Sequence, residues 1–196
     1  MQFSFDPSRS ALLSMDYQTG IVSRYAKDLE GFLPRAASVL KHARVSGMTV
    51  LHVQVGFRPN LPEVSSRNLL FSAIKGSPEH QRLFQGANAA IHPAVAPEGD
   101  DIVVTKHRVS AFTGTDLDLI LRAREIDTLI LFGIATSGVV LSTLLHASDA
   151  DYRLAVIHDC CADLDPEVHA CLIGKVFSRR AVVLSAEDFL HSATSP

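Results

Sequence analysis

The sequence has no segment that would place the protein in or across a membrane. No run approaches the roughly 20 apolar residues needed to span a bilayer, and the start, MQFSFDPSRS, lacks the basic and then apolar layout of a signal peptide. Basic residues are not in excess either, since the net charge is -3 and a general nucleic-acid-binding protein would show a concentrated basic patch. These absences predict a cytoplasmic protein whose partners include neither membranes nor nucleic acids.

Cysteine is scarce, and its spacing does not suit cross-links or metal sites. Two of the three cysteines, Cys160 and Cys161, are adjacent, which fits neither a disulfide framework nor a spaced zinc site. Free cysteines of this kind are most often small core residues, with a catalytic role as the less favoured alternative. The nine histidines are scattered without an HExxH pair, and His52 is most simply a structural histidine. No catalytic metal is therefore expected.

Motifs for cofactors and nucleophiles are missing as well. The spacing from Gly133 to Gly138 imitates a P-loop, but Val139 and Val140 stand where Lys and Ser or Thr would hold phosphate and Mg²⁺. No GxGxxG follows the first apolar run, which excludes the usual dinucleotide fingerprint. The stretch ATSGV is not the GxSxG turn of serine hydrolases. We therefore expect no cofactor and no serine-hydrolase nucleophile.

Enough apolar sequence is present for one well-packed domain. The 196 residues are 47% hydrophobic and 20% charged, and short apolar runs alternate with longer amphipathic ones. Near-continuous aliphatic strands are typical of parallel strands covered on both faces, so residues 1–196 are predicted to form a single three-layer α/β/α domain with a six-stranded parallel, Rossmann-like sheet. The expected strands are 10–17, 48–55, 101–106, 127–133, 153–159 and 181–186, the expected helices are 33–47, 115–125, 137–152 and 165–177, and residues 56–100 form the least regular part.

Three strand ends of this sheet carry the candidate chemistry. In an open parallel sheet the ligand lies at the carboxyl ends of the strands, where the sequence places Asp16, Lys106 and the turn at 133–139. Backbone N–H groups at the start of a helix can hold a developing oxyanion. A carboxylate, an ammonium and such a turn can make an active site, although a strand-end Asp or Lys can equally be a cap or a surface ion pair.

Several motifs resemble one family of enzymes in order and spacing. The stretch ALLSMDYQTGIV (11–22) is similar to the opening of the isochorismatase-like hydrolases, and residues 103–169, from VVTKHRVSAF to DPEVH, resemble the lysine segment and nucleophile turn of that family. The resemblance extends over most of residues 10–185. It implies the isochorismatase-like hydrolase fold, a small-molecule substrate, and assembly into homo-oligomers such as dimers or tetramers.

In the cysteine hydrolases of this family, a triad of Asp, Lys and Cys attacks amides or nitriles. The resemblance puts the Asp at Asp16, the Lys at Lys106, and Val139 at the place of the cysteine. It also implies a cis peptide bond in the turn. The turn residues that would supply shape and oxyanion donors are Ile134, Ala135, Thr136, Ser137 and Gly138.

Isochorismatases of the same family also lack the cysteine and cleave a vinyl ether. In that chemistry the carboxyl group that matches Asp16 protonates the enol-ether carbon, and water traps the oxocarbenium ion. An acid needs a raised pKa, which burial of Asp16 would favour and a nearby Lys106 would oppose. The turn departs from isochorismatases, which usually have Tyr-Ala-His where this chain has Ala135, Thr136 and Ser137.

Four further residues are candidate substrate contacts, each with a structural alternative. Arg58 and Arg108 could pair with substrate carboxylates, or be solvated or interface arginines. Phe112 is expected to line the pocket or the core, and Gln18 to position Asp16 or to contact a neighbouring loop.

Three functions follow from these residues. The first is a cofactor-free hydrolase in which Asp16 and Lys106 act without covalent catalysis, with vinyl-ether cleavage as the expected reaction. The second is an amide hydrolase that uses water or a hydroxyl of Thr136 or Ser137. The third is a catalytically silent protein of binding or assembly, for which Val139 is the main support.

Overall fold

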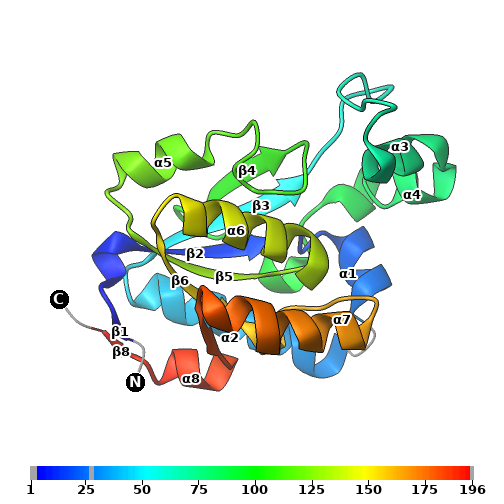
Figure 1. The fold of residues 1–196 in the computed structure, drawn as a ribbon. Coiled ribbons are helices and arrows are strands. Elements are labelled where there is room, and N and C mark those ends of the chain that lie inside the picture. The colour runs from blue at the N-terminus through cyan, green and yellow to red at the C-terminus, as the bar shows by residue number, and fades with distance from the viewer. Residues whose placement is uncertain (1–3, 27–28, 195–196) are drawn as a thin grey trace.

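The core of the protein is a six-stranded parallel sheet (Figure 1). The computed structural model describes residues 4–26 and 29–194. The sheet has the order β4-β3-β2-β5-β6-β7, with every neighbouring pair parallel. The predicted fold class is thereby confirmed. The strands are β2 (Ser10–Met15), β3 (Thr49–Val55), β4 (Ile102–Lys106), β5 (Thr128–Gly133), β6 (Arg153–Ile157) and β7 (Val182–Leu184).

The two central strands are buried along their whole length. Every residue of β2 and of β5 is buried, as expected for strands with helices on both faces. Towards the edge, β4 alternates between buried and exposed positions, and Val103 is 44% exposed. The aliphatic runs that predicted the strands are therefore the interior of the middle layer.

Helices cover both faces of the sheet. In Figure 1, α6 lies in front of the sheet and α2 behind it, and α2 packs against α8. This arrangement follows from right-handed crossovers on the two sides of β2. The helices that follow the strands of the sheet include α2 (Leu29–Val45), α5 (Leu117–Ala123), α6 (Leu141–Asp149), α7 (Pro166–Cys171) and α8 (Ala186–Leu190).

The least regular part of the sequence contains short helices. Figure 1 shows α3 (Leu69–Gly76) and α4 (Pro78–Arg82) near α1 (Thr19–Tyr25), beyond the carboxyl ends of the strands. Asn68 and Ser77 cap α3 and α4, because each side chain accepts a hydrogen bond from a backbone N–H of the first turn. Near the two ends of the chain, β1 (Ser4–Phe5) and β8 (Ala193–Thr194) form a separate parallel pair.

Candidate active site

The candidate site lies where the order of the strands reverses. From β2 the chain builds β3 and β4 on one side of the sheet and then returns to β5 on the other. Asp16 follows β2, the turn at 134–140 follows β5, and Lys106 ends β4. Crevices at such switch points are the usual ligand sites of open parallel sheets. The topology therefore brings together the three strand ends that the sequence singled out.

Asp16 and Lys106 form a buried ion pair. Lys106 Nζ lies 2.9 Å from Asp16 Oδ2, with the two residues 3% and 6% exposed, and it also donates to the carbonyl of Arg108. The other carboxylate oxygen, Asp16 Oδ1, is buried without a hydrogen-bond partner among the described residues. Asp16 also has a φ of 59°, in the left-handed region that non-glycine residues rarely adopt. A strained, buried carboxyl group with one free oxygen has the features of a functional group.

The ionisation of Asp16 is set mainly by burial. Loss of solvent raises the pKa of its carboxyl group, and the charge and hydrogen bond of Lys106 lower it. Burial prevails, so the pKa lies above the ordinary value for aspartate. The sequence left open whether burial or Lys106 would dominate the pKa of Asp16. In the structure burial dominates, and a raised pKa suits a carboxyl group that exchanges protons.

The turn after β5 is fixed by contacts on the side of α7. The peptide bond between Ile134 and Ala135 is cis, as the resemblance implied. Thr136 donates its backbone N–H to the carbonyl of Ala162, and its hydroxyl lies 2.8 Å from His169 Nδ1. The N–H of Ser137 is bound by a carboxylate oxygen of Asp163 at 2.7 Å. These contacts hold the turn in one position.

Two hydroxyl groups of the turn are poorly placed for attack on a substrate. Thr136 is fully buried and its hydroxyl is occupied by His169, while Ser137 is exposed. Neither residue lines the cavity described below. By contrast, the backbone N–H of Ala135 donates to no described residue, and Ala135 does line the cavity. The turn thus offers a backbone donor rather than a side-chain nucleophile.

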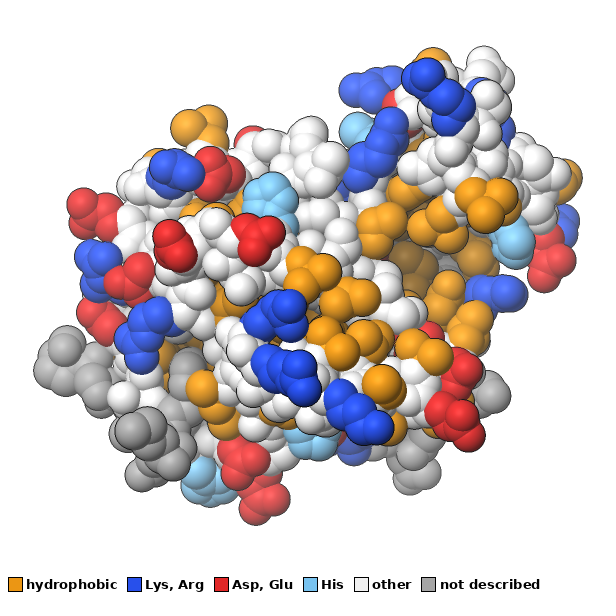
Figure 2. Space-filling view, viewed as in Figure 1, with side chains coloured by type: hydrophobic (Ala, Val, Ile, Leu, Met, Phe, Trp, Pro, Cys, Tyr) orange, Lys and Arg blue, Asp and Glu red, His pale blue; other side chains and the backbone are white. Residues whose placement is uncertain are grey.

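A cavity of about 310 Å³ contains the candidate residues. Asp16, Lys106, Ala135, Gly138 and Val139 line one part of it. Figure 2 shows hydrophobic side chains gathered around a hollow on this face, with basic and histidine side chains at its edge. Such a volume with few polar groups is typical of a small-molecule site. The rest of the lining is mostly apolar and comes from α1, α3, α4 and strand ends: Ile21, Tyr25, Val55, Leu70, Phe71, Ala73, Ile74, Leu83, Phe84, Val109 and Ile134, together with Arg24 and His80.

The four residues expected to contact substrate lie elsewhere. Gln18 is 1% exposed and binds the backbone of Val55 and Ala89, so it ties a strand end to a loop. The side chain of Arg58 is 62% exposed, and Phe112 stacks on His146.

Arg108 does not line the cavity but contacts Phe71, a residue of the cavity wall. Its guanidinium group donates to the carbonyl of Glu63 and lies over the ring of Phe71. Of the described residues that line the cavity, none is one of these four candidates. The contacts of Gln18, Arg58 and Phe112 match the structural alternatives that the sequence offered for them, and side chains of the segment at 57–91 line the cavity instead.

Sequence reasoning missed Arg24 and His80, which line the cavity from α1 and α4. No sequence pattern distinguishes these two residues. Arg24 lies at the end of a short helix, and His80 follows the Ser77-Pro78 start of another. Only the packing of α1, α3 and α4 around the strand ends makes them part of a site. No signal in a single sequence would have found them.

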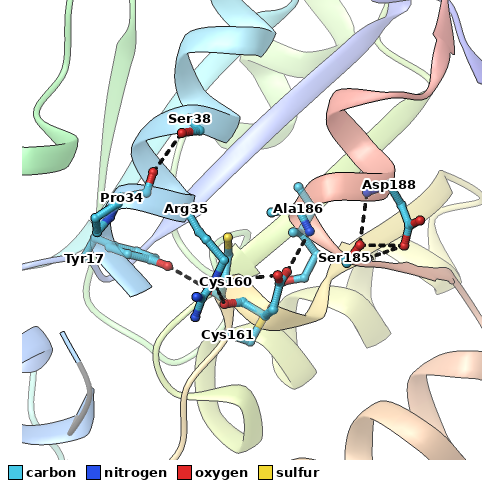
Figure 3. A network of polar contacts seen from close by, with 11 residues as sticks. Tyr17, Pro34, Arg35, Ser38, Cys160, Cys161, Ser185, Ala186 and Asp188 are labelled. Carbon is cyan, nitrogen blue, oxygen red and sulfur yellow. Dashed lines mark hydrogen bonds and ion pairs between the residues drawn. The ribbon is translucent and has the colours of Figure 1, made fainter. Parts of the chain in front are cut away.

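The adjacent cysteines belong to the framework behind the site. Tyr17 donates its hydroxyl to the carbonyl of Cys160 at 2.7 Å, a contact seen in Figure 3. Burial raises the pKa of both thiols, that of Cys161 to about 12, so neither is a thiolate near neutral pH. The same network joins α2 to the end of β6, because Arg35 donates to the carbonyl of Asp159. The cysteines are core residues, as expected.

The described residues contain neither a metal-binding cluster nor a membrane-spanning helix. No group of three or more His, Cys, Asp or Glu side chains in this part of the chain could hold a metal ion. No helix among residues 4–26 and 29–194 is long and apolar enough to cross a membrane.

Comparisons with known proteins show the family and the fold of the chain. A model of the isochorismatase domain matches residues 10–188. The chain is 27% identical over 188 residues to maleamate amidohydrolase of Pseudomonas putida, covering 93% of this chain and 86% of that protein. It is 33% identical to the uncharacterized isochorismatase family protein YecD of Escherichia coli O157:H7, covering 93% and 95%. The structure of an isochorismatase family protein from Burkholderia thailandensis is 29% identical, with a TM-score of 0.76 and coverage of 92% and 93%.

Proposed function

We propose that this chain, which belongs to the isochorismatase family of hydrolases, hydrolyses a small molecule in this cavity without a covalent intermediate. Asp16 is the acid and base of the reaction, Lys106 stabilises its charge, and no cofactor takes part. The observation that carries the proposal is the buried carboxyl group of Asp16, a residue that lines the cavity, whose Oδ2 is paired with Lys106 and whose Oδ1 has no hydrogen-bond partner among the described residues. Val139, which the resemblance puts at the nucleophile's position, lines the same cavity and cannot attack.

Cleavage of a vinyl ether is the first candidate reaction. Asp16 in its protonated form gives its proton to the terminal carbon of the enol ether, which leaves an oxocarbenium ion and an Asp16 carboxylate. Water adds to the oxygen-bearing carbon of the oxocarbenium ion and returns a proton to Asp16, and the resulting hemiketal then separates into a carbonyl compound and an alcohol. The raised pKa of Asp16 supports this role, because a larger fraction of an acid with a raised pKa is protonated at a given pH.

Hydrolysis of an amide is the second candidate, favoured by the similarity to the maleamate amidohydrolase of Pseudomonas putida. Asp16 as a carboxylate would take a proton from water, the hydroxide would add to the carbonyl carbon, and the proton would pass to the leaving nitrogen. The developing oxyanion needs a donor, and we assign this role to the N–H of Ala135, a residue that lines the cavity and whose N–H donates to no described residue. A raised pKa also makes Asp16 a better base.

Cytoplasmic location and homo-oligomerisation are further parts of the proposal. Large hydrophobic side chains are exposed on several helices, with Leu69 at 86% and Leu119 at 71%. Apolar surface of this kind supports an association between copies of the chain. Sedimentation of the purified protein gives the oligomeric state directly.

The test is a hydrolysis screen of vinyl ethers, amides and nitriles with the wild type and Asp16→Asn. We expect turnover of one class by the wild type and a loss of about 10²- to 10⁴-fold in Asp16→Asn, the usual range for a positioned acid or base. Asp118→Asn is the matched control, because Asp118 lies on the exposed face of α5 and pairs only with Arg122. The products identify the class.

Two results would contradict the proposal. Turnover that is unchanged in Asp16→Asn would remove Asp16 from the chemistry. Binding of these compounds without hydrolysis of any of them would support the third function, a silent binding protein. The open cavity beside Asp16 and Lys106 supports an enzyme over that alternative.

A further inference from the structure

The cavity wall beside α3 has a small core of its own. Leu61, Val64 and Phe71 form a buried cluster that is distinct from the main core, with Ile74 and Val109 packed against it. Three residues of this group, Phe71, Ile74 and Val109, line the cavity. A cluster of three buried side chains makes few apolar contacts, so polar contacts with the neighbouring strand end contribute to its position.

Arg108 links this cluster to the backbone that follows β4. Its Nη2 donates to the carbonyl oxygen of Glu63 at 2.9 Å, and its Nη1 donates to the carbonyl oxygen of His107 at 2.6 Å. The guanidinium carbon lies 5.6 Å from the centre of the Phe71 ring, within the range of a cation–π contact. One half-buried side chain therefore joins the loop before α3 to the end of β4 and contacts an aromatic ring of the wall.

The backbone of the same residue holds the lysine of the ion pair. Lys106 Nζ donates to the carbonyl oxygen of Arg108 at 3.1 Å and lies 2.9 Å from Asp16 Oδ2. A continuous series of contacts thus runs from the Phe71 ring through Arg108 and Lys106 to Asp16. Lys106 is 3% exposed, and a buried ammonium group needs such partners because it has lost its water.

We infer that Arg108 is a positioning residue for the reaction. Its guanidinium group fixes the backbone carbonyl that orients Lys106, and in this way it sets the geometry of the pair between Lys106 and Asp16. Arg108 does not line the cavity, so it acts through Lys106 and not on the substrate. This inference rests on the proposed function of Asp16 and Lys106, and it applies equally to the cleavage of a vinyl ether and of an amide.

Arg108→Met tests this role, because methionine retains an apolar side chain and loses the charge and every side-chain N–H group. We expect kcat to fall by about 10- to 100-fold, since a displacement of about 1 Å at a catalytic group can cost about 10²-fold. KM should change much less, because the side chain does not touch the substrate. Arg108→Lys retains a cation and a donor without the planar group, and it should retain part of the activity.

The titration of Asp16 is a second readout, and it needs no substrate. The charge and hydrogen bond of Lys106 lower the pKa of this carboxyl group, so a displaced Lys106 should leave the pKa of Asp16 higher than in the wild type. NMR of the carboxyl carbon of Asp16 at a series of pH values follows this change in Arg108→Met and Arg108→Lys. A purely structural role of Arg108 would lower the stability without moving this titration.

Arg67→Met is the matched control, because Arg67 is an exposed arginine shortly before α3 that lies outside the cavity lining. It should have the kcat, the KM and the Asp16 titration of the wild type. Unchanged kcat, or an unchanged titration of Asp16, in folded Arg108→Met would overturn the inference. If Arg108→Met does not fold, the same measurements on Arg108→Lys decide, because smaller changes in the same direction are expected there.

The inference and the proposed function fail separately. If the wild type hydrolyses none of the compounds, the proposed function fails, and the titration of Asp16 still decides whether Arg108 positions Lys106. If Asp16→Asn loses turnover and folded Arg108→Met retains it, the proposed function stands and the inference is overturned.

Discussion

At the scale of single residues, Val139 decides what kind of chemistry the cavity allows. Its side chain is 3% exposed and lines the cavity together with Asp16. An isopropyl group has neither an electron pair for attack nor a proton to exchange, and for this reason the proposed function assigns the reaction to Asp16 and water. The resemblance to cysteine hydrolases implies that a thiol at this position would have a base within reach.

Val139→Cys is therefore expected to create covalent amide hydrolysis. Asp16 would deprotonate the new thiol, and the thiolate would form an acyl-enzyme that water releases. We expect amidase turnover about tenfold or more above the wild type, together with a mass increase that corresponds to the acyl group. Mass spectrometry of the protein quenched during turnover checks both the adduct and its position.

Val140→Cys is the matched control, because Val140 is the next residue, is fully buried and lies outside the lining of the cavity. It should form no acyl-enzyme. Equal labelling of the two variants, or no activity in Val139→Cys with a folded protein, would show that Val139 does not occupy a nucleophile's position.

At the scale of elements, the sheet was predictable from the sequence and the cavity wall was not. The predicted strand at 127–133 differs from β5 by one residue. The prediction was this close because a short aliphatic run between two helices is typical of a buried parallel strand. The sequence also predicted that Asp16 and Lys106 share one site, since the carboxyl ends of parallel strands lie at the same edge of the sheet. Helices α3 and α4 have eight and five residues, too few for a clear period. Tertiary packing alone makes them the wall that carries Phe71 and His80.

The contact between β2 and β5 requires glycine at the end of β5. A Cβ atom at Gly133 would lie 2.7 Å from the carbonyl oxygen of Met15 and 2.9 Å from its Cβ. Gly133→Ala must therefore push β2 and β5 apart beside Asp16. We expect it to lower the free energy of unfolding by about 1–3 kcal/mol, the usual cost of overpacking a core, and to reduce turnover. Urea denaturation measures the first effect.

Gly138→Ala controls for the change of residue type in the same segment. A Cβ atom at Gly138 meets only Ala135 Cβ at 3.7 Å, an ordinary contact. This variant should be as stable as the wild type or slightly more stable, by about 0.5–1 kcal/mol, because alanine restricts the unfolded chain. Equal stability of the two variants would mean that the close approach at Gly133 does not constrain the sheet.

At the scale of the whole molecule, a buried network opposite the active site links stability to pH. His52 is 1% exposed on β3, and its Nε2 lies 3.0 Å from Asp101 Oδ2, which also binds Arg44 of α2. Burial lowers the pKa of His52, although Asp101 raises it in part. Below a pH of about 6.5, the ordinary value for histidine, the unfolded chain binds a proton at this residue more readily than the folded chain does.

The free energy of unfolding should therefore fall as the pH decreases from about 6.5 towards the lowered pKa of His52. His52→Gln keeps a donor for Asp101 but cannot titrate, so its stability should depend less on pH in this window, even if it is lower at pH 8 by roughly 1 kcal/mol. Urea denaturation at several pH values between 5 and 8 measures the slopes. A slope in His52→Gln equal to that of the wild type would exclude His52 as the group responsible.

Asp101→Asn should change the same slope in the opposite direction. Asp101 and, to a smaller extent, Glu98 favour the protonated form of His52, while Arg44 disfavours it. Without the carboxylate, the pKa of His52 falls further, so the loss of stability continues to lower pH than in the wild type. This variant also loses the carboxylate that accepts hydrogen bonds from Arg44, and it should be less stable at every pH. Opposite changes in slope for His52→Gln and Asp101→Asn would assign the pH dependence to this one buried pair.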